Sequence, residues 1–375
     1  MVIGIDVRPL IGNGVSGVEI YTKELLKQLF LQYPKTTFIL YCNAARKQHH
    51  LYTTFKSANV KIVHTRVPNK ILNISLSWFR WPKIDRTILK KTGLQPHTFF
   101  CPDLRITPIS EECKKIMVVH DLSFHHFPQY FSLQTRLWYK ILNPKRELKK
   151  SDHLIAVSEF TKKDLIRTYN ILETKITTIH EGIDEKLTAN IPLQELQKKY
   201  NLPKDYFLFL ATIEPRKNIK NLLQAFTHFN QTNSKVHLVL AGKTNPKIFA
   251  TVPKQQRKNI HFIGFVEEQD KASLYTNAKA FIYPSLFEGF GLPLLEAMKV
   301  GTPVITSNIS SMPEVVGDAA LLIDPQEPAT ITAAMEKVLD PSTTKKLQSK
   351  MKDQIKKYSW EKAAKQTAKL LSLCE

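Results

Sequence analysis

The sequence predicts an α/β protein made of two doubly wound, parallel-sheet domains of the Rossmann-like kind. Short apolar runs that read as strands alternate with helix-period segments along the chain, which is typical of parallel sheets covered by helices. The alternation fills two blocks of about 180 residues, and 375 residues can bury two cores. Ligands of such folds bind at the carboxyl ends of strands, and two domains can place those ends across a cleft.

The first block alternates seven apolar runs, rich in Val, Ile and Phe, with segments in which apolar residues recur every three or four positions. Its strands are expected at Val2–Val7, Phe38–Cys42, Val60–His64, Thr98–Cys101, Ile116–His120, His153–Val157 and Ile176–His180. Its helices are expected at Val18–Gln32, Ser77–Lys91, Leu133–Lys150 and Thr161–Tyr169.

The second block begins after the polar stretch 181–204, where we expect no strand. Its strands are expected at Tyr206–Ala211, Val236–Ala241, Ile260–Ile263, Ala280–Tyr283, Pro303–Thr306 and Ala320–Ile323. Its helices are expected at Ile219–Asn233, Gln269–Asn277, Leu292–Val300 and Ala329–Leu339, and 342–374 reads as helical with a break near Trp360. The domains are therefore expected at 1–182 and 183–356.

Composition indicates a soluble protein, with 43% hydrophobic and 23% charged residues. The longest apolar run, Tyr206–Ile213, falls far short of the ~20 residues of a membrane span. The first residues read as a strand rather than a signal peptide. Cysteines at 42, 101, 113 and 374 form no CxxC pair or metal-ligand spacing, so we expect free thiols in the cytoplasm.

The net charge of +21 is concentrated in the first half, where residues 1–180 carry 28 Lys and Arg against 13 Asp and Glu. Such an excess favours an anionic partner: a membrane surface, a nucleic acid or a phosphorylated substrate. Most of these cations are lysines, which are point charges, so the excess alone does not indicate readout of a base sequence.

Residues 285–304, SLFEGFGLPLLEAMKVGTPV, read as a loop, a helix and a second loop. Gly289 and Gly291 allow a sharp turn, and the helix start offers unpaired N–H groups to an anion. Glu288 precedes this helix and Glu296 lies inside it. Either the two carboxylates belong to a ligand site, or Glu288 only offsets the helix dipole and Glu296 is solvated.

Two further motifs of the second block follow predicted strands. In TIEPRKNI (212–219), Arg216 and Lys217 open a helix, where two cations oppose the dipole unless an anion binds there. The loop 264–266 follows the third strand. Both motifs lie where the topology places a site.

The first block has two weaker motifs. A glycine loop with Gly12, Gly14 and Gly17 precedes the first helix; it could hold phosphate, but it matches no established fingerprint and could equally be a connector. His120 follows a strand, and the adjacent Asp121 could orient or charge it.

Taken together, the motifs resemble the family 4 retaining glycosyltransferases, which have the two-domain GT-B fold. The resemblance rests on PSLFEGFGLPLLEAM with the carboxylate pair, EPRKN at 214–218, GF at 264–265, GTPVITS at 301–307, PEVVGDAALLIDP, the glycine loop, His120-Asp121 and VSEFTKKDL at 157–165. It covers nearly the whole chain. It implies that helix 357–375 returns to the first domain.

The resemblance also implies roles for individual residues. Arg216 and Lys217 would neutralise the diphosphate of a nucleotide sugar, with Glu288 on the sugar hydroxyls, Glu296 on the ribose and His120 on the sugar. The expected catalytic residues are His120, Arg216, Lys217 and Glu288. The expected donor-binding residues are Gly14, Ser16, Gly17, Asp121, Glu214, Gly264, Phe265, Val266, Gly289, Phe290, Gly291, Leu292 and Glu296.

The implied reaction transfers a hexose from a GDP- or UDP-linked donor to a glycan or lipid-linked acceptor. Mannose is the favoured hexose. We expect retention of configuration, with fixed cations stabilising the departing diphosphate. No metal would be required. Base, sugar, acceptor and oligomeric state stay open; lipid-linked saccharide, lipopolysaccharide core and small glycoside are all candidate acceptors.

Three other functions fit parts of the sequence. A glycosidase also uses two carboxylates, but Glu288 and Glu296 would lie ~12 Å apart if both were helical, beyond the spacing that hydrolysis needs. Because Glu288 is expected before the helix, this weakens the glycosidase alternative but leaves it open. A sugar-nucleotide epimerase of related architecture would turn over the donor without an acceptor. A nucleic-acid binder would explain the charge, but the basic residues are scattered and form no known module, so we expect no nucleic-acid partner.

The stretch 76–91, LSWFRWPKIDRTILKK, mixes three aromatic with five basic residues. It could be an interfacial amphipathic helix on an anionic membrane, or a helix that packs its aromatics into the core. The first alternative would make the protein peripheral to the inner face of the membrane.

Overall fold

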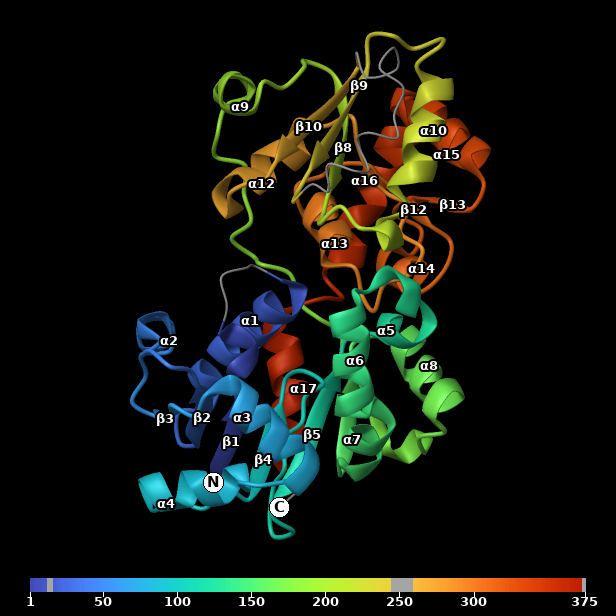
Figure 1. Ribbon diagram of the computed structural model, residues 1–375. Helices are drawn as coiled ribbons and strands as arrows, with labels where there is room; N and C mark the ends of the chain where they lie inside the picture. Colours follow the sequence, from blue (N-terminus) through green and yellow to red (C-terminus); the bar gives the residue numbers. More distant parts are fainter. Residues whose placement is uncertain (12–15, 244–258, 373–375) are drawn as a thin grey trace. The chain divides into compact units, whose positions relative to one another are not determined.

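The computed structural model describes residues 1–11, 16–243 and 259–372 and divides into two compact units (Figure 1). The first unit runs to Gly182 and includes the residues from Ser359 on, and the second runs from Ile183 to Tyr358. Each has its own sheet of parallel strands with helices packed against it. The predicted class of two doubly wound domains is confirmed.

The described strands of the first unit form a seven-stranded sheet, in which the order is β3-β2-β1-β4-β5-β6-β7 and all pairings are parallel. The order reverses between β1 and β4, which makes this the switch point of the sheet. The strands are β1 (Val2–Asp6), β2 (Thr37–Asn43), β3 (Val60–Thr65), β4 (Thr98–Cys101), β5 (Lys114–Val119), β6 (His153–Ala156) and β7 (Ile176–Thr178).

Helices surround this sheet, and their buried faces meet a core centred on residues such as Phe99, Met117 and Leu154. They are α1 (Gly17–Gln32), α2 (His49–Thr54), α3 (Asn69–Ile74), α4 (Ile84–Thr92), α5 (Ser123–His126), α6 (Leu133–Leu142), α7 (Pro144–Lys150), α8 (Glu159–Tyr169) and α17 (Trp360–Ser372). A π-helical turn, η2 (Ser75–Phe79), continues α3, and 3₁₀ turns lie at Arg8–Leu10, Pro128–Tyr130 and Glu173–Lys175.

The second unit repeats the plan, with the order β10-β9-β8-β11-β12-β13 among its described strands and a switch point between β8 and β11. Its strands are β8 (Tyr206–Leu210), β9 (His237–Ala241), β10 (Ile260–Gly264), β11 (Ala280–Tyr283), β12 (Val304–Ser307) and β13 (Leu321–Ile323). Its helices are α9 (Leu193–Tyr200), α10 (Ile219–Phe229), α12 (Glu268–Thr276), α13 (Leu292–Lys299), α14 (Met312–Val316), α15 (Pro328–Val338) and α16 (Pro341–Ile355), with a 3₁₀ turn at Pro215–Lys217.

Helix α17 belongs to the first unit, as the sequence predicted, and packs against α1. One of its faces is buried: Trp360, Ala364 and Leu371 are each at most 5% exposed. The Trp360 ring meets the Tyr21 ring edge to face, with 5.7 Å between the centroids. The predicted break near Trp360 is also confirmed, because α16 ends at Ile355 and α17 begins at Trp360.

Two of the long helices expected in the first unit are each broken at a proline. The expected helix Ser77–Lys91 is instead η2 and α4, separated at Arg80 by a left-handed backbone (φ 54°) ahead of Pro82. A residue before proline avoids the helical conformation, and proline lacks the N–H that a helix needs. The expected helix Leu133–Lys150 is likewise α6 and α7, divided at Asn143 (φ 49°) and Pro144.

The aromatic residues of the stretch 76–91 are not in the core. The exposed fractions of Trp78, Phe79 and Trp81 are 78%, 74% and 67%. Of the two alternatives for this stretch, the helix that packs its aromatics into the core is therefore wrong. Across the described residues, no helix combines the length and the apolar character that crossing a membrane requires.

Candidate active site

The candidate site residues of the second unit follow the two strands that flank its switch point. The turn Pro215–Lys217 comes soon after β8, and the loop that holds Ser285 and Glu288 comes directly after β11. Since parallel strands end at one edge, residues far apart in the sequence meet there. Arg216 and Lys217 precede α10 in a 3₁₀ turn rather than opening that helix, and Asn218 (φ 59°) starts the helix.

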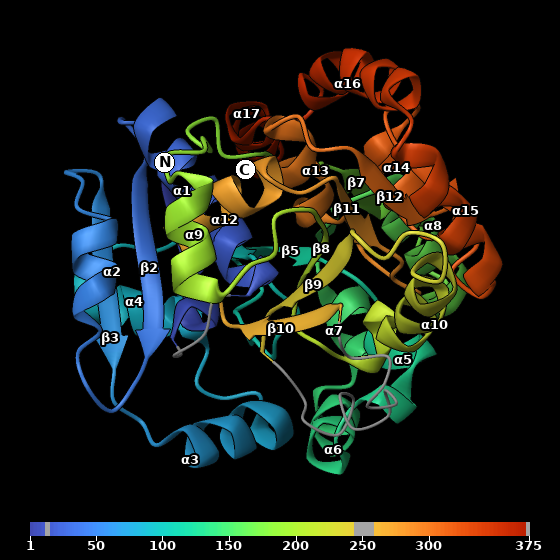
Figure 2. The same ribbon diagram turned by 90° about the horizontal axis from the view of Figure 1, so that it is seen from above.

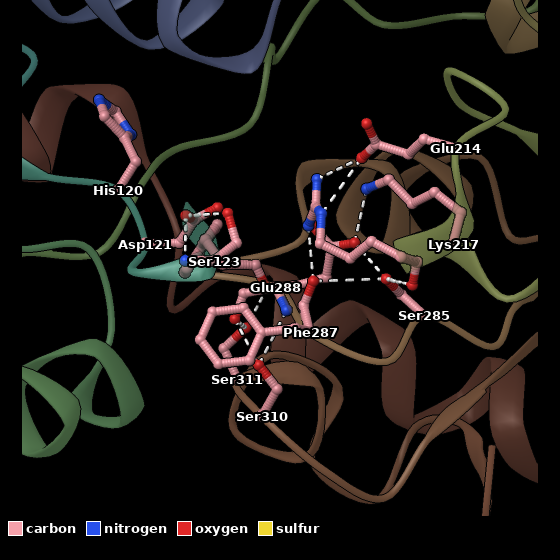
Figure 3. A network of polar contacts seen from close by, with 12 residues as sticks. His120, Asp121, Ser123, Glu214, Lys217, Ser285, Phe287, Glu288, Ser310 and Ser311 are labelled. Atoms are coloured by element: carbon pink, nitrogen blue, oxygen red, sulfur yellow. Dashed lines mark hydrogen bonds and ion pairs between the residues drawn. The ribbon is translucent and has the colours of Figure 1, made fainter. Parts of the chain in front are cut away.

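Glu288 is buried between the two cations (Figure 3). The Lys217 Nζ donates to Glu288 Oε1 at 2.5 Å and to the Tyr283 hydroxyl at 2.6 Å. The Arg216 Nη1 lies 3.0 Å from Glu288 Oε2. Ser285 Oγ also donates to Oε1 at 2.5 Å. Both carboxylate oxygens are therefore engaged, and the interpretation that Glu288 merely offsets a helix dipole is wrong.

The pKa values reflect this crowding. Burial alone would raise the pKa of Glu288, but the charges of Arg216 and Lys217 outweigh it and lower that pKa to about 2. Burial lowers the pKa of Lys217, and repulsion from Arg216 acts in the same direction, while attraction to Glu288 opposes both. Glu288 is therefore ionised at neutral pH.

The surrounding backbone fixes this cluster in place. Arg216 also donates to the Phe287 carbonyl at 2.5 Å and to Glu214 Oε1 at 2.7 Å. The Glu288 N–H donates to Ser310 Oγ at 2.9 Å, and its carbonyl accepts from Ser311 Oγ at 3.0 Å. The loop is therefore anchored to the segment after β12, and the side chain of Glu288 is positioned before any ligand binds.

Helix α13 begins just beyond this cluster. Gly291 has φ 112°, a backbone that suits glycine, and the helix start has no side-chain cap. Gly289 and Phe290 before it are buried, and Phe290 packs on Tyr358 with 5.5 Å between ring centroids. The start at Leu292 agrees with the sequence prediction.

Glu296 lies on α13, inside the helix as expected. Its Oε2 accepts a hydrogen bond from the Tyr275 hydroxyl at 3.0 Å. The side chain is half-buried, and burial raises its pKa against the attraction of Lys271. It is therefore not a simply solvated carboxylate.

The expected loop 264–266 ends β10. Gly264 has φ 74°, where a side chain would strain the backbone. Phe265 is 61% exposed and Val266 is buried. The exposed ring of Phe265 lies at the carboxyl end of a strand, next to the buried Val266, and such a ring suits stacking on a flat ligand.

The first unit has a cavity of about 510 Å³ at its own switch point. Its lining combines aromatic rings with charged and amide side chains, including Asp103, Arg105, His120, Asp121, Trp138 and Tyr139. Asp103 and Arg105 follow β4, and His120 follows β5. The strand-end rule that singled out His120 therefore located a real cavity.

His120 has partners at both ring nitrogens. Nε2 donates to the Pro102 carbonyl at 2.9 Å, and Nδ1 lies 3.4 Å from Glu181 Oε1. Burial lowers the pKa of His120, but Glu181, with a smaller contribution from Asp103, outweighs burial and raises it. The Asp121 carboxylate instead accepts from the Ser123 N–H at 2.8 Å and the Ser123 hydroxyl at 2.6 Å (Figure 3).

The expectation that Asp121 orients His120 is therefore wrong, and Glu181 has this position. Sequence reasoning missed Glu181 although it follows β7, so the strand-end rule could have found it. It also missed Ser285, although this residue opens the stretch 285–304, and Tyr283, Ser310 and Ser311, which lie outside the quoted motifs.

Replacing Glu181 with glutamine should lower the pKa of His120, because burial is then no longer outweighed by a carboxylate. The matched control, Asp121→Asn, should leave that pKa nearly unchanged. NMR titration of the His120 ring measures both. Because the His120 pKa is raised in the wild type, the contact between His120 and Glu181 contributes its full stabilisation at pH values below the ordinary histidine pKa. That stabilisation is lost as pH rises through the raised pKa. A larger shift in Asp121→Asn than in Glu181→Gln would contradict this assignment.

The glycine loop is described only in part. Gly14 lies outside the described residues, as does Gly12. Ser16 caps α1, since its Oγ accepts from the Glu19 N–H at 3.2 Å. Gly17 is the first residue of α1, and apart from its chain neighbours and the backbone of its own helix, no atom of the described residues lies within 4 Å of where its Cβ would project.

Comparison with known proteins agrees with this architecture. Residues 15–187 match the family described as Glycosyltransferase Family 4, and residues 193–358 match Glycosyl transferases group 1. The chain is 34% identical to the O-antigen chain mannosyltransferase B of Escherichia coli, over 68% of this chain and 69% of that protein. It is 32% identical to the serotype-specific mannosyltransferase WbdA of Escherichia coli over 60% of this chain, but spans only 29% of that longer protein.

A solved structure shares the whole fold. The Anabaena protein HepE in complex with UDP-glucose matches with a TM-score of 0.71 over 99% of each chain, at 16% identity. At that identity the likeness concerns the fold alone.

Proposed function

Because the chain belongs to the family 4 glycosyltransferases, with their GT-B fold, we propose that it is a retaining hexosyltransferase that uses a nucleoside-diphosphate sugar. The mannosyltransferase names of its relatives favour mannose as the sugar. The acceptor is a saccharide or a lipid-linked saccharide of the kind that O-antigen synthesis elongates. We place the reaction in the cytoplasm, where the buried cysteines 42, 101 and 113 stay reduced.

The single observation that carries this proposal is the cation pair at the switch point of the second unit. Arg216 and Lys217 are fixed beside the start of α13, and α13 has no side-chain cap. Two fixed cations and a helix start are what a diphosphate needs. Phe265, which follows the edge strand β10, would contact the base, and Glu296 the ribose.

Glu288 suits orientation of the sugar better than nucleophilic attack. Its pKa is about 2 and its two oxygens already accept hydrogen bonds or ion pairs, so it is a weak base. We therefore propose that no protein group attacks C1. The bond from C1 to the diphosphate breaks, the acceptor oxygen bonds C1 on the same face, and the acceptor proton passes to the departing phosphate oxygen.

In this proposal the Arg216 and Lys217 side chains, rather than a bound metal, meet the negative charge that develops on the leaving group. They are held by Glu288 and the Phe287 carbonyl before the reaction, so little reorganisation is needed when charge builds up.

The cavity of the first unit suits a saccharide acceptor. Trp138 and Tyr139 offer flat apolar surfaces to sugar C–H faces, while Asp103 and Asp121 can accept hydrogen bonds from sugar hydroxyls. This lining mixes aromatic rings with carboxylates and with the cationic Arg105, which suits the C–H faces and hydroxyl groups of a sugar.

A thermal-shift comparison of GDP, UDP, GDP-mannose and UDP-glucose tests the donor. A ligand at about 100 times its Kd adds about 2.7 kcal/mol to the free energy of unfolding, a rise in Tm of about 5–10 °C here. We expect one nucleotide and its sugar conjugate to give this shift with EDTA present. Adenosine diphosphate serves as the control.

NMR of the first-formed product then tests the reaction. We expect the anomeric configuration of the donor to be retained. Inversion would refute the mechanism, and turnover of the donor without any acceptor would indicate an epimerase instead.

A further inference from the structure

The segment from α3 to Trp81 exposes a row of large apolar side chains. Ile71, Ile74 and Trp78 recur at helical spacing on one face and are 60%, 58% and 78% exposed, and Phe79 and Trp81 extend the row. The alternate positions, Leu72 and Leu76, are buried. The segment therefore has an inner apolar face that packs and an outer apolar face that does not.

Helix α6 has the same two-sided character. Leu133, Leu137 and Ile141 recur every four residues and are 80%, 59% and 43% exposed. On its other side, Leu142 and Trp138 join Leu72 and Leu76 in one small core cluster. The inner faces of the two elements thus reach one apolar cluster, which also contains Ile106, and Figure 2 shows α3 and α6 on the same side of the first unit. We call the eight outer residues of the two elements the apolar ridge.

Cations surround the ridge. Residues 66–91 carry seven Lys or Arg and one acid, Asp85, and residues 133–150 carry six and one acid, Glu147. Both acids are buried: Asp85 accepts from the Ser110 N–H, and Glu147 pairs with Lys115 and Arg80. The exposed charge on these two segments is therefore positive.

These cations are close enough to repel one another. The pKa of Lys150 is lowered, first by partial burial and then by repulsion from Arg146, Arg80 and Lys83. The positive groups next to Trp81 and those of α7 therefore share one region. Such crowding is relieved when an anionic surface approaches.

We propose that the apolar ridge docks onto the surface of an anionic lipid bilayer. Tryptophan and phenylalanine bind at the boundary of headgroups and acyl chains, and isoleucine and leucine add apolar area. Lysine and arginine beside them pair with lipid phosphates. The protein lies on the membrane and does not cross it.

Other occupants fit the ridge less well. A second copy of the chain, joined symmetrically, would bring the same cations face to face. A nucleic acid could use the cations and the rings, but it has no use for the aliphatic rows on α3 and α6. The combination of exposed aliphatic, aromatic and cationic groups matches an anionic membrane.

The ridge is continuous with the cavity of the first unit. Asn73 lines that cavity between Leu72 and Ile74, and Trp138 lines it beside Leu137. Docking therefore brings the rim of the cavity to the lipid headgroups, where a lipid-linked saccharide would present its sugar. This last step rests on the proposed function, whereas the docking itself does not.

Vesicle sedimentation tests the docking. The wild-type chain should bind vesicles of phosphatidylcholine with about 30 mol% phosphatidylglycerol, and pure phosphatidylcholine at least tenfold less well. Salt raised from roughly 0.1 to 0.5 M should release it. The double variant Trp78→Ser, Phe79→Ser should bind the anionic vesicles at least tenfold less well. The tryptophan fluorescence of the wild type should shift to the blue on binding.

Matched variants separate the ridge from general stickiness and charge. Leu31→Ser with Leu172→Ser removes two side chains that are 75% and 69% exposed elsewhere in the first unit, and binding should be unchanged. Lys149→Gln with Lys150→Gln should weaken binding, whereas Lys345→Gln with Lys346→Gln on α16 should not.

Equal binding to neutral and anionic vesicles, or full binding by the Trp78→Ser, Phe79→Ser variant, would overturn the proposal. The proposal would also be overturned if the wild type formed a dimer in solution, the Trp78→Ser, Phe79→Ser variant were monomeric, and vesicles bound neither of the two proteins. Sugar transfer to a water-soluble acceptor is measured without vesicles. Failure of that transfer alone would refute the proposed function and leave the docking standing.

Discussion

Replacing Arg216 and Lys217 together with alanine is expected to lower kcat/KM for sugar transfer by about 10⁴-fold. The two side chains are the fixed cations at the switch point of the second unit, and removal of one preorganised donor from a transition-state anion costs about 10²–10³-fold. Donor affinity should fall as well, because the same cations meet the diphosphate before the reaction. Steady-state kinetics and titration of the nucleotide diphosphate measure the two effects.

The fold of this variant needs its own control, because it leaves the Glu288 carboxylate buried without its cationic partners. An unpaired buried charge costs about 3–5 kcal/mol. Adding Glu288→Gln removes the charge, so the triple variant should recover most of the stability but none of the activity. Lys220→Ala, on the exposed side of α10, should change neither. If the double variant keeps donor affinity and turnover, the assignment of the donor site is refuted.

The same cluster has a pH signature. The pKa of Glu288 is depressed to about 2, so the stability that it contributes is fully present above the ordinary carboxyl range and is lost as pH falls through about 2. Activity of the wild type should therefore show no ionisation of Glu288 near neutral pH. An acidic limb in its pH profile belongs to another group.

Trp360→Ala should lower the free energy of unfolding of the first unit by about 3–5 kcal/mol. The ring is 5% exposed, packs edge to face on Tyr21 and begins the helix that packs on α1. Lys362→Ala, on the exposed face of the same helix, should cost less than about 0.5 kcal/mol. Urea unfolding followed by circular dichroism measures both.

This loss should be confined to the first unit. Two transitions are then expected in the variant, and a nucleotide that binds the second unit should move only the later one. A Trp360→Ala protein that unfolds within about 1 kcal/mol of the wild type would show that α17 is dispensable, against the buried face that the structure gives it.

Local patterns in the sequence were enough to predict the fold. Apolar runs such as Tyr206–Leu210 consist of aromatic residues and leucines without a polar interruption, so tertiary context had little to override. The long helix expected over Ser77–Lys91 failed at Pro82, because apolar periodicity continued through a residue that breaks helices. Whether Trp78 faces the core or the solvent was not decidable from periodicity, since either face of an amphipathic helix can be the packed one.

The sequence predicted which residues belong to the candidate site, but not which of them contact one another. The strand-end rule found Lys217 and Glu288 separately. Their 2.5 Å contact joins positions 71 residues apart and depends on β8 lying next to β11. No local pattern encodes that neighbour relation. The same reason explains why Asp121, next to His120 in the chain, was preferred over Glu181, which only the fold brings close.

The position of α17 has a consequence for the order in which the protein forms during synthesis. The first stretch of the first unit ends at Gly182, which lies so close to Trp360 that a side chain at 182 would come within 2.1 Å of the Trp360 nitrogen. The packing of the first unit is therefore completed by residues that are translated much later. The second unit is one continuous segment and can fold as soon as it leaves the ribosome. The first unit therefore cannot complete its packing until the rest of the protein has been made. Until then, the surface of α1 that α17 covers is exposed to chaperones.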